Sequence, residues 1–407
     1  MSALQSVADA IARMLDDVGT ATLNTETLPL AQLDGRILAV DIVSPMTVPA
    51  FDNSAMDGYA LRAADAELLA GVGLTVMGTA QAGHPFAGTL AAGQAVRIMT
   101  GAELPDGADT VLMQEVIERN GDTIRSSEPV NIGVNVRYAG EDIRSGELLL
   151  ARGQRLTPLH IGLLASVGLA EISVYRRLKV ALFSSGDELC QPGQPRRAEQ
   201  IYDSNRFALR AMLERLPVEI IRFEWLPDDL AAIRSALSEA AAQADVLITS
   251  AGVSVGDADF TKQVIDELGQ VNFWKVAMKP GKPFAFGRLQ NCWFFGLPGN
   301  PVSSLVTLDQ LAQPVLRRLT GERTEAPLSL PAVAATGFRK QPGRQDFQRS
   351  RLSVQNGQLQ AEPSGIQGSG LLRGFAEADG YTVLEAERGR VSAGETVSVQ
   401  LFGPLLR

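Results

Sequence analysis

Apolar positions follow different periods along this chain, and the changes of period divide it into parts. Residues 4–15 carry an amphipathic helical stripe. From about residue 46, short alternating runs broken by Gly, Pro and Asp replace that period and predict a β-rich module. A helical pattern returns over residues 156–168. We therefore predict a discontinuous N-terminal domain, residues 1–45 and 140–177, with a β-rich domain of residues 46–139 inserted into it.

Residues 178–326 have a different rhythm, in which apolar runs of strand length alternate with segments of helix length. Strands are predicted at 179–183, 218–226, 245–249, 271–276 and 292–296. Helices are predicted at 205–216, 230–242 and 302–319, with one more after the loop that follows residue 249. Asp203 or Ser204 is the expected cap of the first helix. This alternation is typical of a doubly wound, mostly parallel α/β sheet.

The tail, residues 327–407, is β-like again, with turn signals at Gly337, Asn356-Gly357 and Gly394. We expect a small C-terminal β-barrel-like domain there. The predicted fold is thus multidomain: an α/β sheet domain, an inserted β-rich domain, an N-terminal helical or mixed domain and the C-terminal barrel. A length of 407 residues agrees with this division, because it exceeds what one hydrophobic core normally organises.

Composition limits the class of partner. The net charge of −9 argues against a broad nucleic-acid surface. No apolar run reaches membrane-spanning length and the N-terminus lacks a signal-peptide pattern, so we expect a cytoplasmic protein with no membrane partner. The two cysteines, Cys190 and Cys292, and the two histidines have no metal-ligand spacing, which argues against a zinc site or a disulfide framework.

The loop ITSAGVSVGDADF, residues 248–260, is the strongest candidate for chemistry. An apolar strand leads into small residues, past which backbone N–H groups can approach a phosphate. Asp257 and Asp259 follow and can hold a divalent cation against that anion. A tight strand-to-helix turn with solvated acids has the same appearance, so the loop alone leaves both interpretations open.

Other charged side chains also follow predicted strands. These are Glu188, Asp228, Asp259, Lys279 and Lys282, and Lys275 lies near the end of the strand predicted at 271–276. The carboxyl ends of parallel strands share one edge of the sheet, where ligands bind in open α/β folds. Carboxylates suit Mg²⁺, and lysines suit a phosphate or a tetrahedral oxyanion. The pattern therefore predicts one site for Mg²⁺ and an anionic ligand, with helix-start acids and solvated lysines as the structural alternative.

Three further segments are polar or rich in turn residues. In GLPGNPVSS, Pro301 stands near a helix start, where its missing N–H costs nothing. In FDNSAMDGYA, a hairpin turn at Asp57-Gly58 would explain why the segment is polar and rich in turn-forming residues. Ordinary turns would equally explain RIMTGA at residues 97–102. The residues themselves do not connect these last two segments with the α/β edge.

Eight motifs follow one another along essentially the whole chain: FDNSAMDGYA, RIMTGA, GEDI, SSGDEL, IYDSN, SAGVSVGDADF, KPGKPFAFG and GLPGNPVSS. In this order they closely resemble the MoeA family, molybdopterin molybdenumtransferases related to the C-terminal domain of gephyrin. The resemblance implies insertion of molybdate into adenylylated molybdopterin with Mg²⁺, releasing AMP and molybdenum cofactor. It also implies an elongated homodimer in which the α/β domain of one subunit and the β-rich module of the other form each active site.

The resemblance assigns residues motif by motif. It implies that the partner subunit contributes Asp57, Thr100 and Asp142 to catalysis. The catalytic acids, which would also be the metal ligands, would be Glu188, Asp228 and Asp259. Substrate binding is implied for Gly252, Ser254, Lys275, Lys279, Pro298 and Pro301 and, from the tail motifs GRQDFQR and IQGSG, for Arg349 and Ser369. One departure is Ala251, which stands where the family has a glycine and would be strained at a positive φ.

Two other functions stay open. A molybdopterin adenylyltransferase-like enzyme would share the α/β domain, although the additional N-terminal and tail domains argue against it. A gephyrin-like scaffold would share the whole architecture, although the acids and lysines of the sheet edge argue against a purely structural role. Molybdopterin adenylyltransferase and molybdoenzymes are the candidate protein partners that the resemblance implies.

Overall fold

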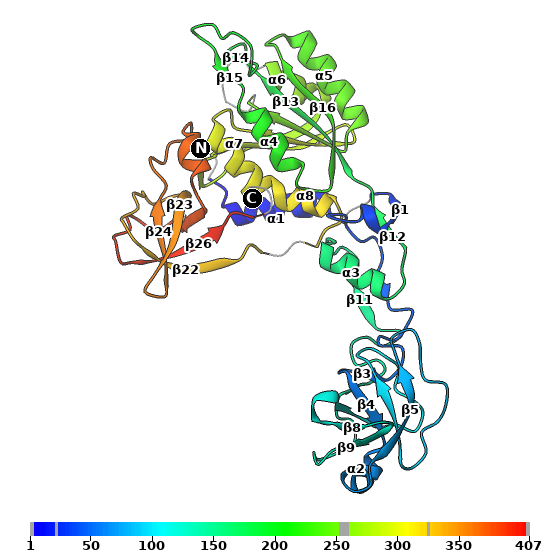
Figure 1. Ribbon diagram of the computed structural model, residues 1–407. Helices are drawn as coiled ribbons and strands as arrows, with labels where there is room; N and C mark the ends of the chain where they lie inside the picture. The colour runs from blue at the N-terminus through cyan, green and yellow to red at the C-terminus, as the bar shows by residue number, and fades with distance from the viewer. Residues whose placement is uncertain (1–3, 21–22, 252–259, 324–325, 404–407) are drawn as a thin grey trace.

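The computed structural model describes residues 4–20, 23–251, 260–323 and 326–403. The molecule is elongated, with the α/β domain and the C-terminal barrel side by side at one end and the inserted β-rich module at the other (Figure 1). Between them lies a narrow N-terminal domain that the chain enters twice (Figure 1). The predicted multidomain organisation is confirmed.

The α/β domain is built on a six-stranded sheet of order β16-β13-β17-β21-β20-β18. Its strands are β13 (Leu178–Ser185), β16 (Val218–Leu226), β17 (Val246–Ser250), β18 (Gly269–Lys275), β20 (Pro283–Leu289) and β21 (Cys292–Leu297). The first four in the sheet are parallel, whereas β20 is antiparallel to both of its neighbours. The prediction of a mostly parallel sheet is confirmed. Strand β20 was missed because its first residues were interpreted as part of a Pro-Gly turn.

Helices cover both faces of this sheet. They are α4 (Asn205–Leu213), α5 (Leu230–Gln243), α6 (Phe260–Leu268), α7 (Pro301–Thr307), the π-helical segment η4 (Leu308–Ala312) and α8 (Gln313–Leu319). Val180 and Leu182 of β13 pack with α4, α7, η4 and α8, whereas Ala181 and Phe183 pack with α5 and α6. Successive strand residues point to opposite faces, so one buried strand supplies both cores.

The N-terminal helix α1 (Val7–Val18) begins with Ser6, whose Oγ accepts a hydrogen bond from the Asp9 N–H. The predicted amphipathic helix is confirmed. Its buried residues Val7, Ala10 and Met14 belong to the core that contains η4 and α8. The helix therefore covers the α/β domain of its own chain.

The N-terminal domain pairs strands that are distant in sequence. Strand β1 (Thr25–Pro29) lies antiparallel to β12 (Glu171–Tyr175), and β2 (Ile42–Val43) lies antiparallel to β11 (Leu148–Leu150), beside helix α3 (Pro158–Ser166). Two short strands, β3 (Asn53–Ser54) and β10 (Val136–Arg137), pair where the chain enters and leaves the inserted module. The residues before and after the module thus form one structural unit.

The inserted module has a sheet of order β7-β4-β6-β5-β9-β8. Its strands are β4 (Gly58–Leu61), β5 (Leu74–Ala80), β6 (Gln94–Ile98), β7 (Thr110–Met113), β8 (Glu118–Asn120) and β9 (Thr123–Arg125), with helix α2 (Ala66–Ala70) beside them. Packing requires a glycine at position 58, because a Cβ there would lie 1.9 Å from the Leu112 carbonyl oxygen of β7. The β-rich prediction for this region is confirmed.

The C-terminal domain is a closed barrel of β22 (Ser329–Ala334), β23 (Gln345–Gln355), β24 (Gln358–Pro363), β25 (Gly380–Leu384) and β26 (Thr396–Leu401). The pairing of β23 with β25 closes it, and helix α9 (Leu372–Ala376) precedes β25. The short strand β19 (Met278–Lys279) of the α/β region adds in parallel to β23 and joins the two domains. In the part of the chain that the structure describes, no helix is both long enough and apolar enough to cross a membrane.

Candidate functional site

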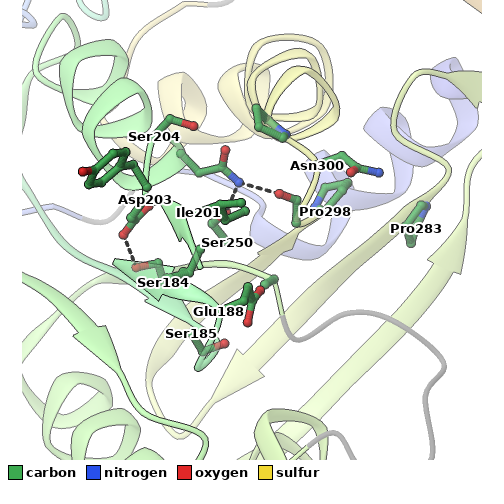
Figure 2. Close-up of a pocket in the computed structure, with 16 residues that line it drawn as sticks. Ser184, Ser185, Glu188, Ile201, Asp203, Ser204, Ser250, Pro283, Pro298 and Asn300 are labelled. Atoms are coloured by element: carbon green, nitrogen blue, oxygen red, sulfur yellow. Dashed lines mark hydrogen bonds between the residues drawn. The ribbon is translucent and has the colours of Figure 1, made fainter. Parts of the chain in front are cut away.

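A cavity of about 430 Å³ lies where the carboxyl ends of β13, β17 and β21 meet (Figure 2). From β13 the chain first builds β16 on one side and later builds β17 on the other. Such a switch of direction opens a crevice at the carboxyl edge, where ligands bind in open α/β sheets. Its lining includes Ser184, Glu188, Tyr202, Ser250, Pro298 and Pro301. The predicted edge therefore carries a real cavity.

A buried ion pair fixes one wall of this cavity. Asp203 accepts hydrogen bonds from the Ser184 hydroxyl (2.6 Å) and from the Arg206 Nε–H (3.1 Å). The second carboxylate oxygen of Asp203 accepts the Arg206 backbone N–H (3.2 Å), in the first turn of α4. Of the two residues expected to cap this helix, Asp203 and Ser204, Ser204 stands at the N-cap position without a side-chain capping bond, and the Asp203 side chain makes the bond to the first turn. The start of α4 is thereby tied to the end of β13.

Asn205 links the other elements and presents an unused acceptor. Its Nδ2 donates to the hydroxyl of Ser250 (2.9 Å), the last residue of β17, and to the Gly299 carbonyl (2.7 Å) before α7. Its Oδ1 is buried and has no hydrogen-bond partner in the described residues. Since buried polar atoms are normally paired, this oxygen is suited to accept an N–H from a ligand. Residue reasoning did not single out Asn205, although the motif IYDSN contains it.

Two of the three predicted acids lie at the carboxyl edge of the sheet. Glu188 lines the cavity, and its carboxylate folds over Gly186, where a Cβ would lie 2.3 Å from Glu188 Oε2. Asp228 exchanges hydrogen bonds with the turn after β13: the Asp187 N–H donates to Asp228 Oδ2 (3.4 Å) and the Asp228 N–H to Asp187 Oδ1 (3.3 Å). These contacts bring the ends of β13 and β16 together.

The third predicted acid, Asp259, lies outside the described residues, as do Gly252 and Ser254. Within the described ranges, no three His, Cys, Asp or Glu side chains gather as a metal cluster. The carboxylates of Glu188 and Asp228 nevertheless have the chemistry that Mg²⁺ needs, because this ion is held by one or two carboxylates together with ligand phosphates and water. The residues present at this edge fit Mg²⁺.

The predicted lysines lie near this edge in different surroundings. Lys275 is exposed at the end of β18. Lys279 Nζ lies 3.3 Å from Asp346 Oδ2 of β23, so the lysine is held at the junction with the barrel. Pro283, four residues further on, lines the α/β cavity, as do the predicted Pro298 and Pro301. The Lys279–Pro283 turn thus connects the cavity with the barrel.

The tail residues are connected with the start of α7 through a loop. The Arg349 guanidinium is buried and donates to the carbonyls of Ile366 and Gly368, both at 3.0 Å. The next residue along that loop, Ser369, accepts the Val302 N–H (2.9 Å) at the start of α7 with its carbonyl. Arg349 therefore holds the loop that places Ser369 beside Pro301. The two tail residues and the PGNP turn come together in space.

Comparison with known proteins shows the family of this chain. Three family models match successive parts of the chain: the MoeA N-terminal region (domain I and II) over residues 5–168, a probable molybdopterin binding domain over 181–318, and the MoeA C-terminal region (domain IV) over 331–402. A molybdopterin molybdenumtransferase of Haemophilus influenzae is 49% identical over 98% of this chain and 98% of its own length. The chain belongs to the MoeA family.

More distant relatives have the same extent. A molybdopterin molybdenumtransferase of Synechococcus elongatus is 36% identical over 97% of this chain and 99% of its own length. The crystal structure of the molybdopterin biosynthesis moeA protein from Pyrococcus horikoshii OT3 matches with a TM-score of 0.84 at 28% identity, covering 98% of this chain and 100% of that one. The fold of this MoeA-family chain is therefore that of a full-length relative, including all of its domains.

The residues that the MoeA resemblance assigned to the other subunit lie far from the cavity. Asp57 Oδ1 accepts the Thr100 N–H and the Thr100 hydroxyl, both at 2.8 Å. Both bonds lower the pKa of Asp57, and the bond from the Thr100 backbone N–H has the larger effect. Both residues belong to the inserted module, at the opposite end of the molecule from α4 and α7 (Figure 1). Within one chain, they do not join the cavity.

The structure also describes the Asp57-Gly58 segment of the module and Asp142, which follows the module in the chain. A hairpin at Asp57-Gly58 is wrong, because β3 pairs with β10 while β4 pairs with β6 and β7. The position of Asp57 is set by Thr100 and not by a hairpin turn. Asp142 lies exposed in the turn after β10, and its backbone N–H donates to the Val48 carbonyl (3.2 Å). Asp142 does not line the α/β cavity of the chain that carries it.

Ala251, the residue that departs from the family pattern, has a positive φ, which is the conformation in which an alanine is strained. Ala251 has a φ of 83°, in the region that favours glycine. Its N–H donates to the Leu297 carbonyl (3.1 Å) at the end of β21, which holds this conformation. A Cβ added to Gly299 would lie 3.5 Å from the Ala251 Cβ, an ordinary contact. The strain at Ala251 is therefore one of backbone conformation and not of crowding against Gly299.

Proposed function

We propose that this chain is a molybdopterin molybdenumtransferase, the activity for which its Haemophilus and Synechococcus relatives are named. It would insert molybdate into adenylylated molybdopterin with Mg²⁺, releasing AMP and molybdenum cofactor. The observation that carries the proposal is the cavity at the switch point, which combines an unpaired Asn205 acceptor with carboxylates and nearby lysines. A pterin has ring N–H donors, and its adenylylated form carries phosphates, so both parts have complementary groups here.

The cavity has two features that suit the substrate. Asn205 Oδ1 would accept a hydrogen bond from a pterin N–H and thereby orient the ring. The first residues of α4 and α7 both line the cavity, with Asn205 and Pro301 at their starts. Helix N-termini favour negative charge, which suits the phosphates of the same ligand.

Glu188 and Asp228, with Asp259 completing the set, would hold Mg²⁺. When bound, that ion would reduce the negative charge of the phosphoanhydride and of the departing AMP. The lysines would act on the same charge. Lys279 is positioned by Asp346, and Lys275 is free to turn toward the phosphates from the end of β18. Cleavage of the bond between the pterin phosphate and AMP is then favoured by charges already in place.

The homodimer is part of this proposal. Asp57, Thr100 and Asp142 do not line the cavity of their own chain, whose inserted module and α/β domain lie at opposite ends (Figure 1), and a second copy could supply them. The N-terminal domain exposes large apolar side chains that a partner could cover, including Val40 (45%), Val43 (50%), Leu148 (55%) and Leu159 (83%). An isologous dimer that buries these residues would create two equivalent sites, each made from two subunits.

The test is release of AMP from adenylylated molybdopterin when molybdate is added. Glu188→Gln should lower the rate by at least about 100-fold, because it removes a charge at the reacting phosphates. Glu171→Gln, at an exposed position on β12, is the matched control and should leave the rate unchanged. Undiminished AMP release by Glu188→Gln would contradict the assigned site.

Two outcomes would favour the other functions. ATP-dependent adenylylation of metal-free molybdopterin by the purified protein would indicate an adenylyltransferase. Failure to restore molybdoenzyme activity in cells that lack the transferase, with normal folding and dimerisation, would indicate a scaffold. The protein partners expected from the resemblance, the adenylyltransferase and the recipient molybdoenzymes, can be sought in the same cells.

A further inference from the structure

Three ionisable side chains are enclosed where the helix after the PGNP turn meets the barrel. Asp309 lies in the middle of that helix, on η4, while Arg349 and Tyr381 are directly opposite residues of β23 and β25. The exposed fractions of Asp309, Arg349 and Tyr381 are 5%, 2% and 0%. Opposite residues of an antiparallel pair lie on one face, so the two barrel side chains are neighbours. Ionisable groups are rarely buried together unless they interact.

The Tyr381 ring is held in a fixed orientation. The rings of Phe347, Phe375 and Phe402 surround it, with centroids 6.0, 6.1 and 4.8 Å from that of Tyr381. Its hydroxyl lies beside the Asp309 carboxylate, and burial, followed by the charge of Asp309, raises the pKa of this hydroxyl. The hydroxyl completes no hydrogen bond within the described ranges. It is a donor in position and still unused.

Arg349 also keeps one donor unused. Its two terminal nitrogens donate to the carbonyls of Ile366 and Gly368, whereas its buried Nε–H has no partner among the described residues. The backbone of Arg349 exchanges two further hydrogen bonds with the side-chain amide of Gln367, at 2.9 and 3.0 Å. One arginine therefore determines the position of the loop of residues 366–368.

The Asp309 carboxylate lies next to these unused donors. Gln310 Nε2 donates to its Oδ2 at 2.9 Å. A buried carboxylate that loses its proton is stabilised by further hydrogen bonds. The Tyr381 hydroxyl and the Arg349 Nε–H can supply them, because both are buried in the same cluster without a partner in the described residues.

The other surroundings of the cluster are largely apolar. Helices α1 and α8 also pack against η4, and they bring Met14 and Leu316 to this core. On the barrel side, burial lowers the pKa of Arg349, while Tyr381 and Asp346 oppose that shift. An ionised Asp309 therefore acts mainly on the tyrosine and the arginine.

The loop that Arg349 holds touches the same helix at its start. The Ser369 carbonyl accepts the Val302 N–H (2.9 Å), one residue after Pro301, which lines the α/β cavity. The helix runs on from Val302 through η4, where it carries Asp309. The barrel thus contacts this helix twice, beside the cavity through the loop and at η4 through Tyr381.

We propose that Asp309 is a positioning residue of the transfer reaction, acting through Tyr381 and Arg349 on the loop that adjoins the cavity. This inference rests on the proposed function, because it concerns the substrate of the same cavity. An ionised Asp309 accepts from the Tyr381 hydroxyl and the Arg349 Nε–H, and so fixes the guanidinium that holds the loop. A protonated Asp309 is neutral and attracts these donors much less. Since burial raises the pKa of Asp309 to about 6, the change between these states occurs near that pH.

The pH dependence of KM tests this role. Asp309→Asn cannot ionise, so its KM for adenylylated molybdopterin should equal that of the wild type near pH 5. Near pH 7.5 it should exceed the wild-type value about fivefold, the effect of one hydrogen bond. The kcat should differ by less than about twofold, because the groups at the reacting phosphates are unchanged. A purely structural role would change KM by the same factor at every pH.

Two variants complete this experiment. Asp266→Asn, which changes an exposed carboxyl on α6, is the matched control, and its KM should follow that of the wild type at both pH values. Tyr381→Phe keeps the ring but removes the connecting hydroxyl, and it should show the same rise in KM near pH 7.5. It removes a buried group without a partner in the described residues, so it should fold even where Asp309→Asn does not.

Hydrogen exchange of the loop measures the positioning without turnover. In the wild type, the amides of residues 365–371 should be protected about fivefold more near pH 7.5 than near pH 5, after correction for the intrinsic exchange rate. This gain should be absent from Asp309→Asn and from Tyr381→Phe.

Two results would overturn the positioning role. One is a ratio of the Asp309→Asn KM to the wild-type KM that does not change with pH. The other is equal protection of the loop in both proteins near pH 7.5. Failure of the transferase function is distinguishable, because a wild type that releases no AMP would contradict that function while the exchange of the loop would still report its link to Asp309.

Discussion

A single methyl group distinguishes the loop after β17 from the family pattern. Ala251 adopts a φ of 83°, a conformation that costs a non-glycine residue about 1–2 kcal/mol. The hydrogen bond from its N–H to Leu297 keeps the backbone in this conformation. The sequence raised the question of strain at this position, and only the dihedral angle could answer it.

Replacing this alanine should stabilise the protein. Ala251→Gly removes the backbone strain, and the greater freedom of glycine in the unfolded chain offsets part of the gain. We expect a net increase of about 0.5–1 kcal/mol in the free energy of unfolding, measured by urea denaturation. The control Ala242→Gly, at an exposed position in α5, should lower stability instead. A loss of stability in both variants would contradict the strain.

Asn205 permits a second test at the scale of one residue. Asn205→Ala removes the unpaired Oδ1 acceptor as well as the Nδ2 donor, so the KM for the adenylylated pterin should rise about tenfold. Ser250→Ala is the matched control, because it removes one acceptor of Nδ2 and leaves Oδ1 in place. Its KM should change much less. Equal effects of the two changes would mean that Asn205 acts only by holding the loops together.

At the scale of elements, the helix that follows the PGNP turn contains an unusual group. Its middle segment, η4, is π-helical and carries Asp309, which is buried against the barrel. Burial raises the pKa of Asp309 from 3.8 to about 6, although Gln310 Nε2 donates to its carboxylate at 2.9 Å. Tyr381 of β25 is fully buried nearby; burial, followed by the charge of Asp309, raises the pKa of its hydroxyl. The contact between the α/β domain and the barrel therefore includes a titrating carboxyl.

The direction of the pH dependence follows from that shift. The folded protein holds the Asp309 proton more tightly than the unfolded chain does. The resulting stabilisation is complete below about pH 4 and is lost as the pH rises through about 6. Asp309→Asn cannot lose this proton, so its stability relative to wild type should improve by up to about 3 kcal/mol between pH 4 and pH 7. Denaturation midpoints across this range provide the measurement.

The control for that experiment is Asp266→Asn, which changes an exposed carboxyl on α6. Its difference from wild type should not vary over the same range of pH. A constant difference between Asp309→Asn and wild type would mean that Asp309 ionises normally in the folded protein. The position and type of this helix were predicted from the sequence, because the period of its apolar residues indicates a helix at 302–319. The same pattern shows neither the π-helical segment nor the burial of Asp309.

At the scale of the whole molecule, the central question is how the two ends cooperate. The Asp57–Thr100 pair and the α/β cavity lie at opposite ends of one chain (Figure 1). If each active site combines the module of one subunit with the cavity of the other, inactivating changes at the two ends should complement each other. This behaviour separates a shared site from a site within one chain.

Mixing two inactive variants tests this arrangement. Thr100→Ala and Glu188→Gln should each be inactive alone. After subunit exchange, half of the dimers are mixed, and each mixed dimer has one fully intact shared site, so AMP release should recover to about a quarter of the wild-type rate. No recovery, with exchange confirmed by mass labelling, would show that the two ends do not share a site across subunits.

The sequence by itself determined the alternation of strands and helices in the α/β domain apart from β20, the carboxyl edge on which Glu188, Asp228 and Pro298 lie, and the family. Local periodicity and ordered motifs carry this information, because the period of a strand or helix is set by residues close in the chain. The tertiary structure decided which distant segments meet. It inserted β20 into the sheet, placed α1 on the α/β core, closed the barrel through β23 and β25, and set Asn205 against Ser250 and Gly299. Such contacts depend on how faces pack across the fold, which no short stretch of sequence records.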